Sequence, residues 1–256
     1  MKSRTLLIGI IIFLLIAVAG LASSLYNAQK KLAVEKSSCA KEMFDLATES
    51  PEVALRLYQL MKDADMVLNH HNIEYWADGG TILGAVRHQG IIPYDDDLDI
   101  EIDAKDIPKI EIALQDLEKL GYVIGQNRED WIQIFKYDSY TKKENHLDIF
   151  AIKFNGNEPY FANQVAETQF GKKRKLYKNE IFPLKKYQFG EIYISGPNEP
   201  LGYIKEYYSQ DILTKGCIWP KHGNHTIKRG RCLLLEGRML EPLKPTGPLL
   251  DNSTIY

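Results

Sequence analysis

The sequence has little net charge and few cysteines. Its 32 lysine and arginine residues nearly balance its 34 aspartate and glutamate residues, which leaves a formal charge of −2. A chain with this balance has no general attraction for nucleic acid, so nucleic acid is not an expected partner. Three cysteines, Cys39, Cys217 and Cys232, are too few and too scattered for a disulfide framework or a zinc cluster. They leave the redox compartment undecided.

One long apolar run is present near the N-terminus. Thr5 to Ala22 contains no charged residue and follows Lys2 and Arg4, and its length is just sufficient to span a bilayer. A cleavable signal peptide usually has a shorter apolar region, so we expect an uncleaved single-pass anchor in an endoplasmic reticulum, Golgi or bacterial inner membrane. Lysines after the run favour a cytosolic C-terminal domain, whereas the sequons at Asn224 and Asn252 would matter only in a secretory lumen. The side of the membrane stays open.

Beyond this run the periodicity alternates between helix and strand. Ser50-Pro51 is typical of a helix start, and apolar residues recur at helical spacing to about His70. A second helix is predicted over residues 107–120, followed by strands over residues 122–124, 131–137 and 146–152. A strand pair within residues 182–197 and a helix over residues 200–208 follow. With 45% apolar residues, the chain can bury one good-sized α+β core.

An alternating run of carboxylates stands out between Asp97 and Asp103. In an extended strand Asp97, Asp99, Glu101 and Asp103 lie on one face, and the intervening apolar residues lie on the other. Neighbouring aspartates on one face repel each other unless a cation lies between them, and Mg²⁺ or Mn²⁺ suits such oxygen ligands. A solvated acidic edge is the ordinary alternative for an isolated DxD pattern.

The residues just upstream favour the metal interpretation. Asp78-Gly79-Gly80-Thr81 follows a short apolar strand and opens a helix that reaches about His88, so its backbone amides are expected to face an anion. Gly80, Gly84 and Arg87 share one side of that helix. We therefore predict that Gly79, Gly80 and Thr81 bind substrate phosphate and that Arg87 stabilises charge in the transition state. Ordinary turn chemistry is the alternative for a glycine pair.

The stretch GGTILGAVRHQGIIPYDDDLDI resembles the signature of the LicD family, which includes bacterial phosphocholine transferases and the animal fukutin-related proteins. The resemblance is close along Tyr75–Ile102 and looser from there to His222, with Tyr94 standing where most members have tryptophan. It implies a nucleotidyltransferase fold, which is a small mixed sheet flanked by helices with a metal held on two strands. Residues 1–25 are then expected to be the membrane anchor, 26–50 a stalk, 51–240 the catalytic domain and 241–256 a C-terminal tail.

The resemblance also implies a third catalytic carboxylate, and Asp148 is the best candidate. In the segment HLDIFAI, His146, Asp148 and Phe150 lie on one face of an otherwise apolar strand. A charge in such a strand is costly unless a metal or a donor pairs with it. A salt bridge to a lysine is the structural alternative. The metal ligands are therefore expected to be Asp97, Asp99 and Asp148.

The activity implied by the resemblance is metal-dependent transfer of a phospho-alcohol, similar to phosphocholine or ribitol phosphate, from a CDP-linked donor to a glycan hydroxyl. The glycan would belong to a lipopolysaccharide or a glycoprotein. Trp219-Pro220-Lys221-His222 resembles the end of the family pattern, so Lys221 and His222 are further candidates for binding substrate phosphate, although an exposed loop is the plainer interpretation.

Two other functions fit part of the pattern. A DxD glycosyltransferase would also use metal to hold a nucleotide diphosphate, but it generally has a larger nucleotide-binding βαβ region ahead of its aspartates. An inactive, membrane-tethered binding protein of the same fold is the non-enzyme alternative. An EF-hand loop starting at Asp95 is excluded, because Ile100 occupies the required glycine position.

Overall fold

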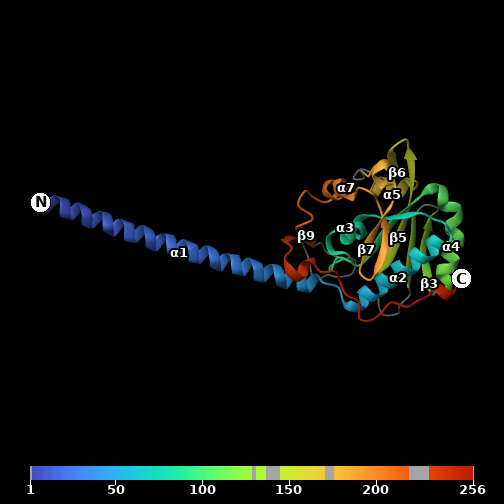
Figure 1. Ribbon diagram of the computed structural model, residues 1–256, viewed down its shortest axis with the longest axis horizontal. Helices are drawn as coiled ribbons and strands as arrows, with labels where there is room; N and C mark the ends of the chain where they lie inside the picture. Colours follow the sequence, from blue (N-terminus) through green and yellow to red (C-terminus); the bar gives the residue numbers. More distant parts are fainter. Residues whose placement is uncertain (1, 129–130, 137–144, 171–175, 219–230, 256) are drawn as a thin grey trace. The chain divides into compact units, whose positions relative to one another are not determined.

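The computed structural model describes residues 2–128, 131–136, 145–170, 176–218 and 231–255 (Figure 1). The chain divides into two compact units, residues Met1–Leu46 and residues Ala47–Tyr256.

Helix α1 (Lys2–Ala47) forms the N-terminal unit, apart from its last residue, Ala47, which belongs to the second unit. Its described side chains from residue 18 to residue 32 are exposed, and they include Ser23, Asn27 and Lys30. A membrane span needs roughly 20 consecutive, mostly apolar residues. Among the residues that the structure describes, no helix combines the length and the apolar character needed to cross a membrane. The prediction of a single-pass anchor at Thr5–Ala22, and the membrane localisation that rested on it, is therefore wrong.

The second unit is built on a mixed six-stranded sheet. Its strands follow the order β1 (Tyr75–Ala77), β2 (Leu98–Asp103), β5 (His146–Asn155), β4 (Trp131–Lys136) and β3 (Tyr122–Arg128), and β6 (Glu158–Phe161) pairs with β5. β2 and β5 are parallel, and the other neighbouring pairs of this sheet are antiparallel. This arrangement confirms the expected mixed sheet flanked by helices.

Three helices pack on this sheet. α2 (Pro51–His70) packs on β5 and on α4 (Ile107–Lys119), whereas α3 (Gly79–His88) packs against β2 (Figure 1). Local chemistry sets their ends: the Ser50 hydroxyl accepts a hydrogen bond from the Val53 amide at 3.4 Å, and Gly121 follows α4 with a φ of +84°. Both helix limits agree with the sequence prediction.

The remaining elements are short and complete the second unit. In chain order they are η1 (Ala104–Asp106), α5 (Gln164–Phe170), α6 (Lys178–Ile181), β7 (Lys185–Phe189), β8 (Ile192–Gly196), α7 (Pro200–Tyr207), β9 (Lys215–Ile218), β10 (Arg231–Leu234), η3 (Gly237–Leu240) and η4 (Ser253–Ile255). β7 and β8 form one antiparallel pair, and β9 and β10 form another. A disulfide joins Cys217 to the directly opposite Cys232. The sequence analysis did not foresee this bond.

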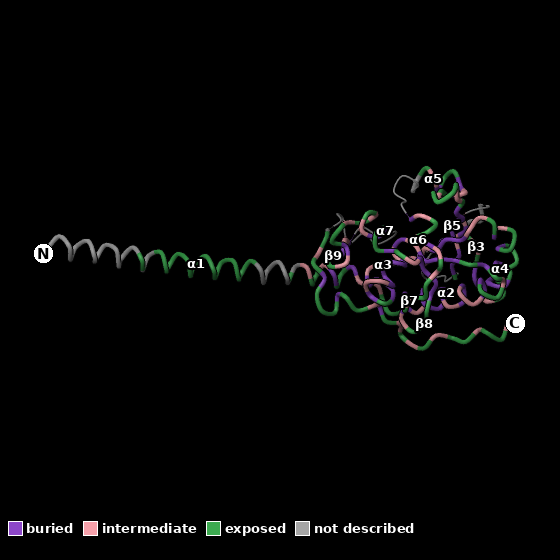
Figure 2. Tube along the Cα trace, turned by 45° about the horizontal axis from the view of Figure 1, so that its top comes forward, coloured by how far each residue is buried: buried purple, intermediate pink, exposed green. Residues whose placement is uncertain are grey.

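Strand β2 shows how the core sets the place of the aspartates. Leu98, Ile100 and Ile102 are all buried, as the alternation predicts. Figure 2 shows buried residues, in purple, in the interior of the second unit. Glu101 is also buried, and its Oε2 accepts a hydrogen bond of 2.6 Å from the indole nitrogen of Trp76 on β1. Because apolar burial on one face fixes the register of the strand, Asp99 is held on the opposite face.

Candidate active site

A cavity of about 410 Å³ lies where β2 and β5 meet, and three aspartates line it. Asp97 immediately precedes β2, Asp99 lies on β2 and Asp148 lies on β5. Asp99 and Asp148 are direct register partners of the parallel pair. Partners of this kind have side chains on the same face of a sheet, so residues far apart in the sequence contribute carboxylates to one cavity.

The electrostatics of this cavity suit a cation. Burial raises the pKa of Asp99 well above its usual range, and the neighbouring carboxylates of Asp97 and Asp148 raise it further. Carboxylate oxygens of Asp95, Asp96 and Asp97 lie within 4.8 Å of one another. Asp97 belongs both to this cluster and to the cavity. The donor set therefore fits a hard, oxygen-binding metal ion, which would offset the mutual repulsion.

Two further side chains of the cavity contact Asp148. The Gln133 amide on β4 donates a hydrogen bond of 3.3 Å to Asp148 Oδ1. His146 Nε2 lies 3.5 Å from Asp148 Oδ2 and 4.0 Å from Asp97 Oδ2. Strand alternation places His146 and Phe150 on the face of Asp148, and both line the cavity. Gln133 could not be found in this way, because its position depends on the pairing of β4 with β5.

The glycine turn packs directly against the acidic residues. Gly79 has a φ of +51°, and a Cβ placed there would lie 2.7 Å from Asp99 Oδ2. A Cβ at Gly80 would overlap Asp95 Oδ2. The Thr81 hydroxyl accepts a hydrogen bond of 2.8 Å from the Asp99 amide. Both glycines are therefore needed for the close approach of α3 and the aspartates, and the binding of substrate phosphate by residues 79–81 stays a prediction.

Arg87, a further predicted site residue, contacts the main chain elsewhere in the second unit. The Arg87 guanidinium donates hydrogen bonds to the main-chain oxygens of Ile212 (2.8 Å) and Lys215 (3.0 Å) and to the Tyr94 hydroxyl (2.9 Å). These contacts join α3 to the first residue of β9 and to the segment ahead of it, and Arg87 is not among the residues that line the cavity. Lys221 and His222 lie outside the described residues.

Aromatic rings form two further walls of the cavity. The first comes from the sheet: the ring of Phe150 lies 5.4 Å from that of Trp131 and 5.5 Å from that of Phe161, measured between centroids. The second comes from Tyr203 and Tyr207 of α7, whose rings are 5.5 Å apart, together with the adjacent Tyr208. The sequence analysis placed Phe150 on the face of Asp148 but did not identify the other rings, because the set is spread over four separate elements or their ends.

Comparison with known proteins gives one family and several relatives. Residues 72–199 match the family model described as LicD/FKTN/FKRP, nucleotidyltransferase domain. An uncharacterized protein of Rickettsia prowazekii is 37% identical over 211 residues, covering 80% of this chain and 75% of the relative.

Two relatives with named activities match shorter segments. The lipopolysaccharide cholinephosphotransferase LicD of Haemophilus influenzae is 53% identical over 102 residues, covering 35% of this chain and 38% of the relative. The human ribitol 5-phosphate transferase FKRP is 34% identical over 86 residues, covering 32% of this chain and 17% of the relative. The chain thus spans less than half the length of these two relatives.

Proposed function

This chain belongs to the LicD/FKTN/FKRP family and is a LicD-type phosphotransferase, and on that premise we propose that it transfers a phospho-alcohol from a CDP-activated donor to a glycan hydroxyl. The observation that carries the proposal is the pairing of Asp99 with Asp148 in a cavity that Asp97 also lines. Such a cluster of carboxylates on two strands is suited to reactions that move negatively charged phosphate groups.

In this proposal the aspartates hold Mg²⁺ or Mn²⁺, with Asp97, Asp99 and Asp148 as ligands. When bound there, such an ion would supply positive charge that offsets the charge of the donor phosphates as CMP leaves. Gln133 fixes one oxygen of Asp148 and leaves the other directed to His146 and the cavity. Asp148 completes the metal site or accepts the proton of the attacking hydroxyl. Gly79 keeps the wall beside Asp99 free of a side chain.

The aromatic walls favour a cationic alcohol over a neutral polyol. Ring faces attract a quaternary ammonium group, as in the recognition of choline by aromatic residues. A polyol would instead leave many hydroxyl groups without hydrogen-bond partners against Trp131, Phe150 and Phe161. We therefore propose a phosphocholine-like group as the transferred unit, with ribitol phosphate as the second candidate.

The identity of the products tests this proposal. The full chain would be incubated with Mg²⁺ and CDP-choline, CDP-ribitol or a nucleotide sugar, without acceptor, so that water acts as a poor nucleophile. We expect slow release of CMP and phosphocholine, because water attacks the phosphorus that bears the alcohol. A DxD glycosyltransferase would release a nucleoside diphosphate and free sugar. That result would overturn the proposal, as would ligand-induced thermal stabilisation without any product, which indicates an inactive binding protein.

A further inference from the structure

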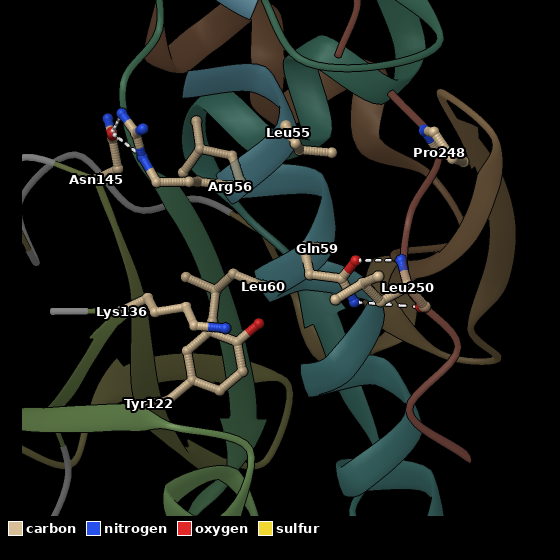
Figure 3. A pocket seen from close by; sticks show the side chains of 10 residues that line it. Leu55, Arg56, Gln59, Leu60, Tyr122, Lys136, Asn145, Pro248 and Leu250 are labelled. Atoms are coloured by element: carbon tan, nitrogen blue, oxygen red, sulfur yellow. Dashed lines mark hydrogen bonds between the residues drawn. The ribbon is translucent and has the colours of Figure 1, made fainter. Parts of the chain in front are cut away.

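A second cavity of about 280 Å³ lies between α2, the β3–β4 pair and the C-terminal segment (Figure 3). Among the described residues it shares no lining residue with the aspartate cavity. Leu55, Leu57 and Leu60 of α2 contribute much of its wall, and Pro248 and Leu250 contribute another part. Most of the surface offered to a ligand is therefore aliphatic.

The wall formed by the C-terminal segment is held by specific bonds. The Leu250 amide donates to Gln59 Oε1 at 2.7 Å, and Gln59 Nε2 donates to the Leu250 oxygen at 3.3 Å (Figure 3). Two residues later, the Asn252 amide donates to both carboxylate oxygens of the buried Asp63 at 3.0 Å. The apolar wall is consequently a fixed part of the fold.

The charged groups of this cavity are both cations. Arg56 donates from Nε and Nη2 to Asn145 Oδ1 at 3.2 and 2.8 Å, which fixes the direction of its guanidinium. The Lys136 ammonium lies 5.5 Å from the centroid of the Tyr122 ring. No carboxylate lines the cavity within the part of the chain that the structure describes. Figure 3 shows Arg56, Lys136 and Asn145 on one side of the view and Leu55, Pro248 and Leu250 on the other.

We propose that this cavity is a second binding site that takes a small amphiphile with an aliphatic chain and one anionic head. Aliphatic walls favour burial of the chain at about 0.8 kcal/mol per CH₂ group. These two cations favour an anionic head and disfavour a cationic one, because opposite charges attract and like charges repel. The head therefore lies between Arg56 and Lys136, and the chain lies against Leu60 and Leu250.

Calorimetric titration of the full chain with decanoate, below its micelle concentration, tests the site. Decyltrimethylammonium has the same chain with the opposite charge and serves as the ligand control. We expect saturable, one-to-one binding of decanoate and a weaker affinity for decyltrimethylammonium by about tenfold or more. Equal affinity for the two ligands, or no saturable binding of decanoate, would overturn the proposal. Binding to phosphatidylglycerol vesicles without binding to free decanoate would also overturn it, because it would indicate a surface contact.

Three exposed-residue variants locate the bound ligand. Lys136→Glu should weaken decanoate binding by about tenfold or more, and Leu250→Asp should do the same while leaving its main-chain bonds to Gln59 in place. Lys153→Glu carries the same charge change at an exposed position outside the cavity and should leave the affinity unchanged. Circular dichroism would confirm that each variant is folded. If Lys136→Glu and Lys153→Glu bind decanoate equally, the assignment of the head group fails. Because binding is read without turnover, the result is independent of the proposed transfer reaction.

Discussion

Asn145 donates a hydrogen bond from its side-chain amide to the main-chain oxygen of Asp96 at 3.0 Å. The same side chain accepts the two hydrogen bonds of Arg56. Asn145 directly precedes β5, which carries Asp148, and Asp96 directly precedes Asp97. One amide therefore connects the acidic segment before β2 to the start of β5 and to helix α2.

Removing this amide should weaken metal binding. We expect Asn145→Ala to lower Mg²⁺ affinity by about tenfold, because groups that orient a metal site typically contribute 10- to 100-fold. Asn145→Asp should cost less, since its carboxylate keeps the Arg56 contact and loses only the bond to the Asp96 oxygen. The exposed Asn179→Ala is the control. Calorimetric titration with Mg²⁺ measures all three, and equal affinities would assign Asn145 a purely structural role.

Asp99→Asn should abolish turnover yet stabilise the metal-free fold at neutral pH. The pKa of Asp99 is raised in the folded chain by burial and by Asp97 and Asp148, above the unfolded value of about 3.9. Its stabilising contribution is thus fully present below about pH 4 and is lost as pH rises through the folded pKa. In EDTA, the free energy of unfolding of the wild type should therefore fall as the pH rises from about 4 through the folded pKa of Asp99. The free energy of unfolding of Asp99→Asn should fall less over the same pH range.

Mg²⁺ should reverse that order. Metal binding stabilises only the protein that keeps its ligands, so the wild type should gain melting temperature with Mg²⁺ and Asp99→Asn should gain little. Asp97→Asn should also abolish turnover, as Asp99→Asn does. Near-wild-type transfer by either variant in the presence of Mg²⁺ would show that the aspartates have been assigned wrongly.

Arg87→Lys separates a structural role of Arg87 from a catalytic one. Lysine cannot reproduce the planar set of donors that reaches Ile212, Lys215 and Tyr94. We expect the free energy of unfolding to fall by about 1.5–3 kcal/mol, the range for a hydrogen bond to a charged group. Denaturant titration measures this loss. A transfer rate reduced more than about tenfold with unchanged stability would instead support the predicted contact with substrate phosphate.

Reduction of the Cys217–Cys232 disulfide should destabilise the second unit. The two cysteines are separated by 15 residues, and a loop of that length corresponds to about 3 kcal/mol of unfolding free energy. Cys217→Ser should therefore melt at a lower temperature, and added dithiothreitol should lower the wild type to the same value. Cys39→Ser should respond to dithiothreitol as the wild type does. A melting temperature insensitive to the reductant would contradict the bond.

The sequence by itself determined the local pattern of this protein. Helical spacing and the Ser50-Pro51 pair define α2, and strand alternation separates the apolar face of β2 from Asp97 and Asp99. Alternation also places His146 and Asp148 on one face of β5. These features depend on neighbours a few residues away, which is why periodicity is sufficient to find them. Local patterns also have a limit. The apolar run Thr5–Ala22 predicted a membrane anchor from its length alone, and that prediction is wrong.

Only the tertiary structure decided which distant groups meet. The parallel pairing of β2 with β5 brings Asp148 beside Asp99, and the pairing of β4 with β5 brings Gln133 to Asp148. Likewise, Arg87 on α3 donates to the main-chain oxygens of Ile212, ahead of β9, and of Lys215, its first residue. Such contacts depend on how the whole chain packs around one core, and no local spacing in the sequence specifies them.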